Sequence, residues 1–503
     1  MKNNKLFYGD NLEVLRLKIP AETVDLCYID PPFNSKRNYN QLYNNVGYED
    51  RAQAQAFTDT WVWDNDAIDG YDQIITNVEG RFQPKLIELI KGLHAVLREG
   101  SLLAYLVSMA CRVTEIYRIL KKTGTFFLHC DPTSSHYLKL TLDAIFCPQG
   151  GDFRNEIVWC YSHGGKSKRW FARKHDTIFF YTKSSEWYFD GKAAGVKRDT
   201  GTKSTGGIIG RDENGRLYQD KLVKASGKYY RYYLDDLKIP EDWWTDINSI
   251  QATSTERLGY PTQKPEALLQ RIITASCKEG DLVLDAYCGC GTTIAVAQRL
   301  KRQWIGIDIT YQSISLVLKR LEEAFGKDVL DDVLLDGIPQ DMDSALALAH
   351  KKDDRLRKEF EKWAVLTYTN NRAAINEKKG ADAGIDARAY FKIGKHDNET
   401  IIFQVKSGGV KRGDIATLRG DMNREEAAMA VLITLEEPSR PMISEAKCAG
   451  QYHHEDMGRS YNRITIVTIR EIVEKNRRLE IPMSLEILKA AQRAAESGQI
   501  DLL

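Results

Sequence analysis

A glycine-rich turn between two short apolar segments most narrowly limits the fold of this chain. Leu282-Val283-Leu284 is expected to form a buried strand that ends at Asp285, and Thr292 to Arg302 is expected to form a helix. A second strand is expected from Trp304 to Ile307, and Asp308 follows it directly. Strand, glycine turn, helix, strand and acid form a βαβ unit, whose ligand lies beyond the carboxyl ends of the strands. The sequence therefore predicts a Rossmann-like α/β fold.

Two acids distinguish this unit from one that binds a dinucleotide. Asp285 lies at the turn, where its charge would repel a pyrophosphate. A carboxylate there suits a ligand that carries an ammonium and a sulfonium group, and Asp308 can accept hydrogen bonds from both ribose hydroxyls. The two acids therefore predict S-adenosylmethionine as the ligand.

A second motif, Asp30-Pro31-Pro32-Phe33, follows the apolar run Val24 to Ile29, so it is expected where a buried strand ends. The carboxylate of Asp30 and the carbonyl of Pro31 can accept the two hydrogens of an exocyclic amino group, and Phe33 offers its face to a flat ring. Such a clamp would orient the amino nitrogen for attack on a methyl donor. An ordinary strand-to-loop turn is the alternative, because Pro-Pro interrupts regular structure wherever it occurs.

The two motifs together resemble those of DNA amino-methyltransferases, which modify adenine N6 or cytosine N4. Asp-Pro-Pro-Phe is similar to the catalytic motif, and residues 285–293 are similar to the cofactor motif, with Cys290 where serine is more usual. The order of the motifs resembles the permuted class called beta, and the resemblance spans roughly residues 1–340. It implies double-stranded DNA as the partner, extrusion of the target base, and adenine N6 rather than cytosine N4, whose enzymes more often begin the motif with serine.

Two further segments complete the resemblance. Thr262-Gln263-Lys264-Pro265 precedes an expected helix, Glu266 to Ser276, and resembles the motif that closes over the methionine end of the cofactor; a capped surface helix is the alternative. Gly9-Asp10 ends another short strand. The resemblance assigns catalysis to Asp30, Pro31, Pro32 and Phe33, and cofactor binding to Asp10, Thr262, Lys264, Pro265, Asp285, Tyr287, Gly289, Gly291, Thr292 and Asp308.

Aromatic and basic residues alternate in the segment from Gly150 to Gln251, where the resemblance places target recognition. Cations can neutralise phosphates, and aromatic faces can fill the gap left by an extruded base; a solvated basic loop is the alternative. The residues concerned are Trp159, Tyr161, Lys166, Lys168, Arg169, Trp170, Phe171, Arg173 and Lys174, and then Lys224, Lys228, Tyr229, Tyr230, Arg231, Tyr232 and Tyr233.

The residues between the clamp and this segment are expected to fill the first half of the sheet. We expect helices from Phe82 to Leu97 and from Arg112 to Lys121, and strands from Ser101 to Val107 and from Thr125 to His129. His129-Cys130-Asp131 offers one imidazole, one thiol and one acid. Without companion ligands these make a poor metal site.

The last third of the chain resembles no part of a methyltransferase. Residues 341–362 are strongly charged and are expected to form an exposed linker helix before a domain at 363–503. There, Asp386 precedes a strand, and Gln404 and Lys406 share one face of the next.

An acid, a second oxygen ligand and a lysine could hold Mg²⁺ and an activated water. Gly384-Ile385-Asp386 with Gln404-Val405-Lys406 resembles the Mrr-like PD-(D/E)xK nucleases. This implies a C-terminal α/β restriction-endonuclease-like domain with Asp386, Gln404 and Lys406 as catalytic residues and Asp386 and Gln404 as Mg²⁺ ligands. Glu377 is a candidate to replace the acid that Gln404 lacks. A domain that binds DNA without cleaving it is the alternative.

Length and composition are consistent with a multi-domain enzyme. A chain of 503 residues with a net charge of +1 is expected to form two or three folding units and to bind DNA through local basic patches. The nine cysteines form no CxxC pairs, which argues against disulfide scaffolds and structural zinc. Without a signal peptide or a run of transmembrane length, the cytoplasm is the expected location. A homodimer, an RNA or protein substrate and a non-catalytic regulator remain open alternatives.

Overall fold

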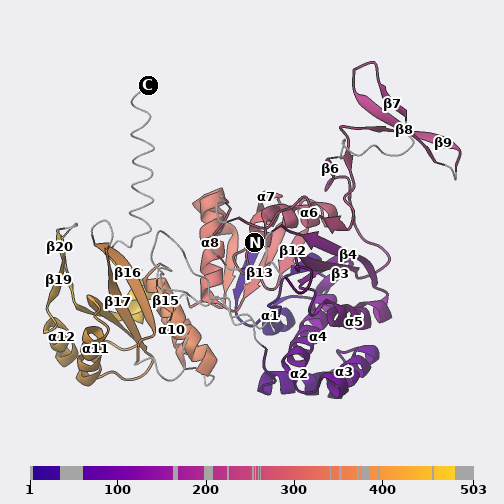
Figure 1. The fold of residues 1–503 in the computed structure, drawn as a ribbon. Coiled ribbons are helices and arrows are strands. Elements are labelled where there is room, and N and C mark those ends of the chain that lie inside the picture. Colours follow the sequence, from indigo (N-terminus) through magenta and orange to yellow (C-terminus); the bar gives the residue numbers. More distant parts are fainter. Residues whose placement is uncertain are drawn as a thin grey trace, which may run out of the picture. The chain divides into compact units, whose positions relative to one another are not determined.

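The computed structural model divides the chain into two compact units, which are described separately below (Figure 1). Within the described residues, the first unit comprises 4–33, 61–308 and 317–334, and the second comprises 309–316 and 335–481, with the gaps given in the next sentence. The structure describes residues 4–33, 61–162, 168–197, 208–223, 226–251, 254, 256–258, 260, 262–339, 341–350, 354–370, 373–375, 384–393, 397–455 and 458–481. Of the predicted site residues, Lys166, Lys224 and Glu377 lie outside these ranges.

A nine-stranded sheet with the order β11-β4-β5-β3-β2-β12-β13-β1-β14 forms the centre of the first unit. The pairs β3/β2, β2/β12, β12/β13 and β13/β1 are parallel, whereas β5 is antiparallel to both β3 and β4. This confirms the predicted α/β class. The strands are β1 (Asn4–Tyr8), β2 (Val24–Ile29), β3 (Leu120–Cys130), β4 (Asp152–Cys160), β5 (His175–Thr182), β11 (Trp243–Trp244), β12 (Leu282–Asp285), β13 (Gln303–Asp308) and β14 (Val333–Asp336).

The middle of this sheet joins two stretches that are far apart in the sequence. Strand β2 pairs with β12, with Leu26 beside Val283 and Cys27 beside Leu284. Because the two strands are parallel, their carboxyl ends lie at the same edge of the sheet. The clamp motif and the glycine turn therefore begin next to each other.

Helices cover this sheet, and one of them replaces a predicted strand. They are α1 (Asn11–Lys18), α2 (Asn65–Thr76), α3 (Pro84–Leu97), α4 (Ser101–Ile119), α5 (Ser135–Phe146), α6 (Glu266–Ser276), α7 (Thr292–Arg299) and α8 (Tyr311–Phe325), with short 3-10 turns at Cys147–Gln149 and Lys327–Asp332. The strand expected from Ser101 to Val107 is wrong, because these residues form the first two turns of α4. Five consecutive side chains of α4, from Leu103 to Val107, are buried, and a helix that is buried all round shows no polar face that would reveal its period.

The inserted segment adds two small sheets to the first unit. Strands β7 (Ile208–Arg211), β8 (Leu217–Val223) and β9 (Lys228–Tyr233) form an antiparallel three-stranded sheet. Strands β6 (Val196–Lys197) and β10 (Leu237–Lys238) form a two-stranded one.

A five-stranded sheet with the order β15-β16-β17-β18-β21 forms the centre of the second unit. Strands β16 and β17 are antiparallel, whereas β17, β18 and β21 are parallel. The elements are α9 (Met342–Ala349), α10 (Asp354–Tyr368), β15 (Ala374–Ile375), β16 (Ala387–Ile393), β17 (Asp397–Lys406), α11 (Arg412–Arg424), β18 (Met429–Thr434), α12 (Arg440–Lys447), β19 (Gln451–His454), β20 (Arg459–Asn462), β21 (Ile464–Thr468) and α13 (Ile469–Glu474).

The prediction of an exposed linker helix at residues 341–362 is wrong, because the segment is neither exposed throughout nor a linker. The segment contains α9 and most of α10, and both helices belong to the core of the second unit. Phe360, Trp363 and Ala364 are buried in that core, at the i, i+3 and i+4 spacing of an apolar stripe. The charged residues around them conceal a helix that is amphipathic.

Among the described helices, none is long and apolar enough to cross a membrane.

Candidate functional site

Three acids end three neighbouring parallel strands of the first unit. Asp30 follows β2, Asp285 ends β12 and Asp308 ends β13. The carboxylate of Asp308 accepts a hydrogen bond from the amide of Gly289 in the glycine turn (2.9 Å). The Asp285 carboxylate accepts hydrogen bonds from the Tyr287 amide (3.0 Å) and from a threonine hydroxyl on α7 (2.6 Å). The predicted clamp and cofactor acids thus share one edge of the sheet.

Burial is the main reason why the pKa of Asp285 rises to about 7, from an ordinary value near 3.8. The negative charges of Asp30 and Asp308 add to this rise, while the two hydrogen bonds to Asp285 oppose it. An edge that concentrates acids in this way favours a ligand with positive charge.

The glycine turn has a backbone that only glycine adopts easily. Gly289 and Gly291 have φ angles of 48° and 74°, in the left-handed region. A Cβ atom on Gly291 would lie 2.8 Å from a methyl group of Val317, so space as well as conformation requires glycine there. Between them, Cys290 is buried, and its carbonyl accepts a hydrogen bond from Arg320 (3.2 Å). The turn is therefore packed from behind, and its own amides bond within the unit: Gly289 donates to Asp308, and Gly291 donates to the carbonyl of Cys288 (2.7 Å).

Asp10 lies beside this turn but already has partners. Its carboxylate caps α1 by accepting the amide hydrogens of Leu12 and Glu13, and it forms an ion pair with Arg112 (2.8 Å). The neighbouring Asn11 donates a hydrogen bond to the carbonyl of Ala286, at the start of the turn (2.8 Å). Asn11 thus ties the start of α1 to the turn, and the contact of Asp10 with the cofactor stays a prediction.

The clamp acid Asp30 forms an ion pair with Lys264, a residue predicted to bind the cofactor. The Lys264 ammonium also lies 5.1 Å from the centroid of the Phe33 ring. The other oxygen of Asp30, Oδ1, is buried and has no hydrogen-bond partner among the described residues. A buried carboxylate oxygen without a hydrogen-bond donor costs free energy. The amino group of a bound substrate would supply the missing donor. Pro31 beside it is buried, whereas Pro32 and Thr262 are half-buried and Pro265 caps α6.

His129 supports the clamp, a role that the sequence analysis missed. Its ring is fully buried at the end of β3 and stacks on Phe33, with centroids 5.9 Å apart and planes 22° apart. Nδ1 lies 2.9 Å from the hydroxyl of Tyr28, and Nε2 lies 3.0 Å from the carboxylate of Asp176. Tyr161 donates a further hydrogen bond to Asp176 (3.1 Å). This chain of contacts fixes the imidazole and, through it, the Phe33 ring.

Both ring nitrogens of His129 therefore already have protein partners. Within the described part of the chain, no three His, Cys, Asp or Glu side chains are grouped so that they could hold a metal ion. Burial opposes ionisation of Asp176, but its hydrogen bonds and the charges of His129 and Lys264 outweigh it and lower the pKa of this carboxyl. A polar residue ending a buried strand next to β2 was the signal that could have revealed His129.

We predict that His129→Phe lowers kcat for methyl transfer roughly tenfold or more, because it removes two buried hydrogen bonds and lets the Phe33 ring shift. The affinity for S-adenosylmethionine should stay within about twofold of the parent, since no predicted cofactor residue contacts the imidazole. Steady-state kinetics with separate kcat and KM values, together with calorimetric cofactor binding, provide the measurement. Asp176→Asn should reproduce part of the kcat loss. An equal loss of cofactor affinity in both variants would instead indicate general damage to the fold.

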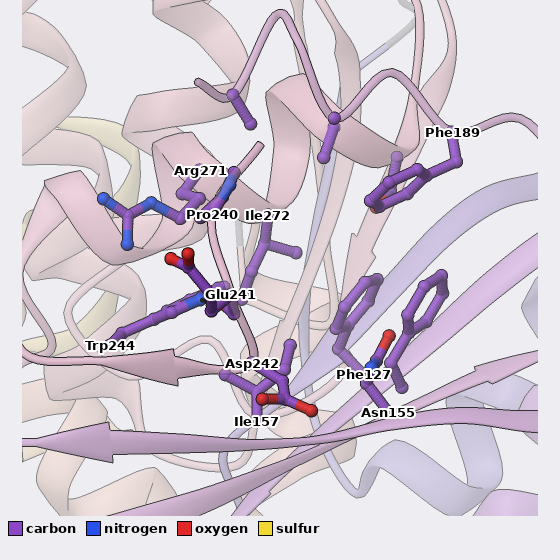
Figure 2. Close-up of a pocket in the computed structure, with 15 residues that line it drawn as sticks. Phe127, Asn155, Ile157, Phe189, Pro240, Glu241, Asp242, Trp244, Arg271 and Ile272 are labelled. Atoms are coloured by element: carbon purple, nitrogen blue, oxygen red, sulfur yellow. Dashed lines mark hydrogen bonds between the residues drawn. The ribbon is translucent and has the colours of Figure 1, made fainter. Parts of the chain in front are cut away.

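The first unit also contains a hollow, and none of the side chains that line it was predicted to act in catalysis or cofactor binding (Figure 2). It encloses about 500 Å³ of empty space, part of it open to solvent, over β3, β4 and β5 and against α6. Phe127 and Phe180 stack on one side, with centroids 4.5 Å apart, and Phe189 stacks on Phe180. The hollow is therefore separate from the clamp.

The basic and aromatic residues of the insert fall into two groups. Those of the first form ion pairs or are buried, and those of the second are exposed. Arg231 of β9 forms an ion pair with Asp220 and lies 3.6 Å from the ring centroid of Tyr218. Trp159 was predicted to face DNA, but it is buried and donates a hydrogen bond to the carbonyl of Ile247 (2.8 Å). It is therefore a core residue, because its apolar ring lies on the sheet face that α6 and the chain around Ile247 cover. The exposed group includes Trp170, Phe171, Tyr229, Tyr230 and Tyr232.

The predicted site residues of the second unit converge around two paired strands. Asp386 donates its amide to the carbonyl of Phe403 (2.9 Å), and its carboxylate accepts the amide hydrogen of Val405 (2.7 Å). The buried amide of Gln404 donates to the carbonyl of Gly384 (2.7 Å). Asp386, directly before β16, thus lies beside the end of β17, and the role of Asp386 and Gln404 as metal ligands stays a prediction.

Glu361 is a second acid at this place, and the prediction of Glu377 overlooked it. Burial and the charge of Asp386 raise the pKa of Glu361 on α10 to about 7, while Lys406 opposes the rise. Glu361 therefore lies within electrostatic reach of both Asp386 and Lys406.

Known proteins resemble the two units separately. The family model described as DNA methylase, of the N6/N4 type, matches residues 24–319, and the one described as NACHT-associated inactive Restriction Endonuclease 1 matches residues 356–474. The second unit is thus similar to a restriction endonuclease of an inactive type.

Three relatives illustrate the resemblance of the first unit. DNA adenine methyltransferase YhdJ of Escherichia coli (strain K12) is 28% identical over 321 residues, which are 63% of this chain and 83% of the relative. Type II methyltransferase M.HpaI of Haemophilus parainfluenzae is 29% identical over 221 residues, 43% of this chain and 60% of the relative. The solved structure of the cytosine-N4-specific PvuII DNA methyltransferase has 14% identity and a TM-score of 0.38, covering 66% of this chain and 95% of its own. Since the DNA methylase model covers more than half of the 503 residues, including the clamp and the glycine turn, this chain belongs to the N6/N4 DNA methyltransferase family.

Proposed function

We propose that this protein transfers a methyl group from S-adenosylmethionine to N6 of adenine in double-stranded DNA. The observation that carries the proposal is the pairing of β2 with β12, which puts Asp30 and its buried, unpartnered oxygen beside the acidic cofactor edge. The strand order, the glycine turn and the acids all support a single site at this edge of the sheet, although Asp30 and Asp285 lie about 250 residues apart in the chain.

The residues at the sheet edge suit S-adenosylmethionine. Asp308 at the end of β13 would accept the ribose hydroxyls, and Gly289 and Gly291 in the left-handed turn carry no side chain that would block a ligand. Asp285 would offset the positive charge of the methionine end. When bound there, the cofactor supplies an electrophilic methyl group on its sulfonium sulfur.

The clamp acts by orientation and polarisation. Asp30 and the carbonyl of Pro31 accept the two hydrogens of the adenine amino group, which turns the nitrogen lone pair toward the methyl donor. Phe33, backed by His129, holds the face of the base. Before the base enters, Lys264 forms an ion pair with Asp30. The amino group must therefore displace Lys264 from Asp30 or share the carboxylate with it. The nitrogen would bond to the methyl carbon as the methyl–sulfur bond breaks, and it would then release its extra proton to water.

Adenine N6 is favoured over cytosine N4 for two reasons. The clamp begins with aspartate, as in the adenine enzymes that it resembles. The relative YhdJ is described as an adenine methyltransferase and matches over 83% of its own length. The order of clamp, insert and glycine turn further supports the beta class.

The test is to express the chain in a host without endogenous DNA methylation and to quantify methylated nucleosides by mass spectrometry. We expect N6-methyladenine, and single-molecule sequencing should locate it in one sequence context. Only N4-methylcytosine would contradict the choice of base. The absence of both modified bases, with methylated RNA or protein in their place, would contradict DNA as the substrate.

The raised pKa of Asp285 predicts that cofactor affinity depends on pH. Between pH 6 and pH 8 this carboxyl loses its proton, so S-adenosylmethionine should bind up to about tenfold more tightly at pH 8. The free protein should respond in the opposite sense. Because the folded state keeps a proton that the unfolded chain releases near pH 4, its stability should fall as pH rises from about 4 to 7.

Calorimetric binding and thermal unfolding across this pH range measure both effects. Asp285→Asn is the matched variant, since it keeps the shape and removes the titration. It should abolish the pH dependence of binding and weaken the decline in stability. Unchanged pH profiles in the variant would assign the dependence to another group.

A second candidate function, Mg²⁺-dependent cleavage of DNA, is favoured by the convergence of Asp386, Glu361, Gln404 and Lys406 in the second unit. Such a unit would combine restriction with modification in one chain. The Mrr-like assignment supports it, whereas the similarity to an inactive endonuclease supports DNA binding without cleavage. Supercoiled plasmid incubated with the full chain and Mg²⁺, with and without prior methylation, distinguishes the two.

A further inference from the structure

The connection between β4 and β5 presents two large aromatic side chains to solvent. Phe171 is 98% exposed, more than any other large apolar side chain in the described ranges, and Trp170 is 66% exposed. Exposed single apolar residues are common, but two adjacent aromatic rings are costly to keep in water and indicate contact with a partner.

Positive charge surrounds this aromatic pair. Lys168, Arg169, Arg173 and Lys174 flank it, and residues 168–174 contain no acid. Lys174 donates a hydrogen bond to the carbonyl of Ser162 (2.7 Å), which ties the two sides of the connection together. A cationic rim around exposed aromatic rings matches the phosphates and stacked bases of a nucleic acid.

The connection is anchored directly at the clamp. Strands β4 and β5 pair up to Cys160 and His175, and the amide of Tyr161 donates to the carbonyl of Lys174 (3.0 Å). Asp176 follows immediately, and its carboxylate holds His129, which stacks on Phe33. Phe171 thus lies five positions before Asp176, whose side chain holds His129 behind the base clamp.

We propose that Phe171, flanked by Trp170, enters the DNA duplex and occupies the space that the target base leaves when it is extruded into the clamp. This inference rests on the proposed function, because only an enzyme that acts on an extruded base leaves such a gap. An inserted ring replaces the stacking that the neighbouring bases lose and so stabilises the extruded state. The flanking cations hold the phosphates on either side.

The experiment compares the parent with Phe171→Ala on two duplexes that contain the methylated site. In one, the target base is paired; in the other, an abasic nucleotide stands opposite it, so that extrusion needs no unpairing. We expect Phe171→Ala to lower kcat/KM on the paired duplex roughly tenfold to a hundredfold, and on the abasic duplex about threefold or less. Phe171→Trp should retain most of the activity, since it keeps an aromatic ring.

Trp243→Ala is the matched control. Trp243 is another exposed aromatic residue of the insert (58%), but its neighbours are acids rather than bases, and its loss should leave both rates unchanged. With 2-aminopurine as the target base, fluorescence should rise on binding of the parent and rise much less with Phe171→Ala.

Equal rates of parent and Phe171→Ala on the paired duplex would overturn the inference. So would an equal loss on both duplexes, which would indicate a role in general DNA binding or in contact with a second protein copy. If the parent methylates neither duplex, the proposed function itself fails. That result differs from a failure of the inference, because the inference is tested only when the parent methylates the duplexes and its rates can be compared with those of Phe171→Ala.

Discussion

Asp30→Ala is expected to lower the rate of methyl transfer roughly a hundredfold to a thousandfold, while S-adenosylmethionine still binds. Oδ1 of the Asp30 carboxylate is buried and has no donor among the described residues. Its loss removes the group that orients and polarises the amino nitrogen. It also removes a negative charge near Asp285, so that Asp285 ionises more easily and cofactor binding should not weaken. Tritium transfer from labelled cofactor to DNA measures the rate, and calorimetry measures the affinity.

Asp30→Asn is the variant that separates chemistry from structure. It keeps the volume of the side chain and one acceptor oxygen, but it loses the charge that pairs with Lys264. We expect it to fold like the parent and to be nearly as inactive as Asp30→Ala. Methyl transfer at the parental rate by either variant would remove Asp30 from the mechanism.

The sequence predicted the parts of the site that local chemistry determines. The glycine turn needs a left-handed backbone, and helix α6 begins at Glu266 and ends at Ser276 as its apolar spacing indicates. Acids at the ends of β2, β12 and β13 could be located because each follows a short apolar run. These features depend on residues that are close in sequence, so a single chain reveals them.

Features that depend on tertiary context were missed. Residues 101–107 form a helix, because α4 is buried on all sides and its apolar run shows no period. Glu361 lies on a helix whose charges suggested a linker, although Phe360 and Trp363 form its core face. A lone histidine in a sequence does not reveal that its two nitrogens and one ring face all find partners, as those of His129 do. Each error concerns a contact between segments that are distant in the chain.

The second large effect is expected in the second unit, where Asp386→Ala or Lys406→Ala should reduce Mg²⁺-dependent DNA cleavage roughly a hundredfold or more. Asp386, which directly precedes β16 and bonds to β17, would ligate the ion, and Lys406 would hold or help deprotonate the attacking water. Glu361→Gln should weaken cleavage too, because it removes the second carboxylate. Methylation should stay at the parental level, since every residue assigned to methyl transfer belongs to the first unit.

Lys447→Ala provides the control, because this lysine at the end of α12 is exposed and forms no part of the site. Nicking of a supercoiled plasmid, measured over a range of Mg²⁺ concentrations, follows the reaction. Cleavage that survives in Asp386→Ala and Lys406→Ala would place the active residues elsewhere. If the parent itself cleaves neither methylated nor unmethylated plasmid, the acids and Lys406 would form a site that has the arrangement of a nuclease site but does not catalyse cleavage. In that case Lys406→Ala should weaken DNA binding by the full chain, since its charge would still face the phosphates.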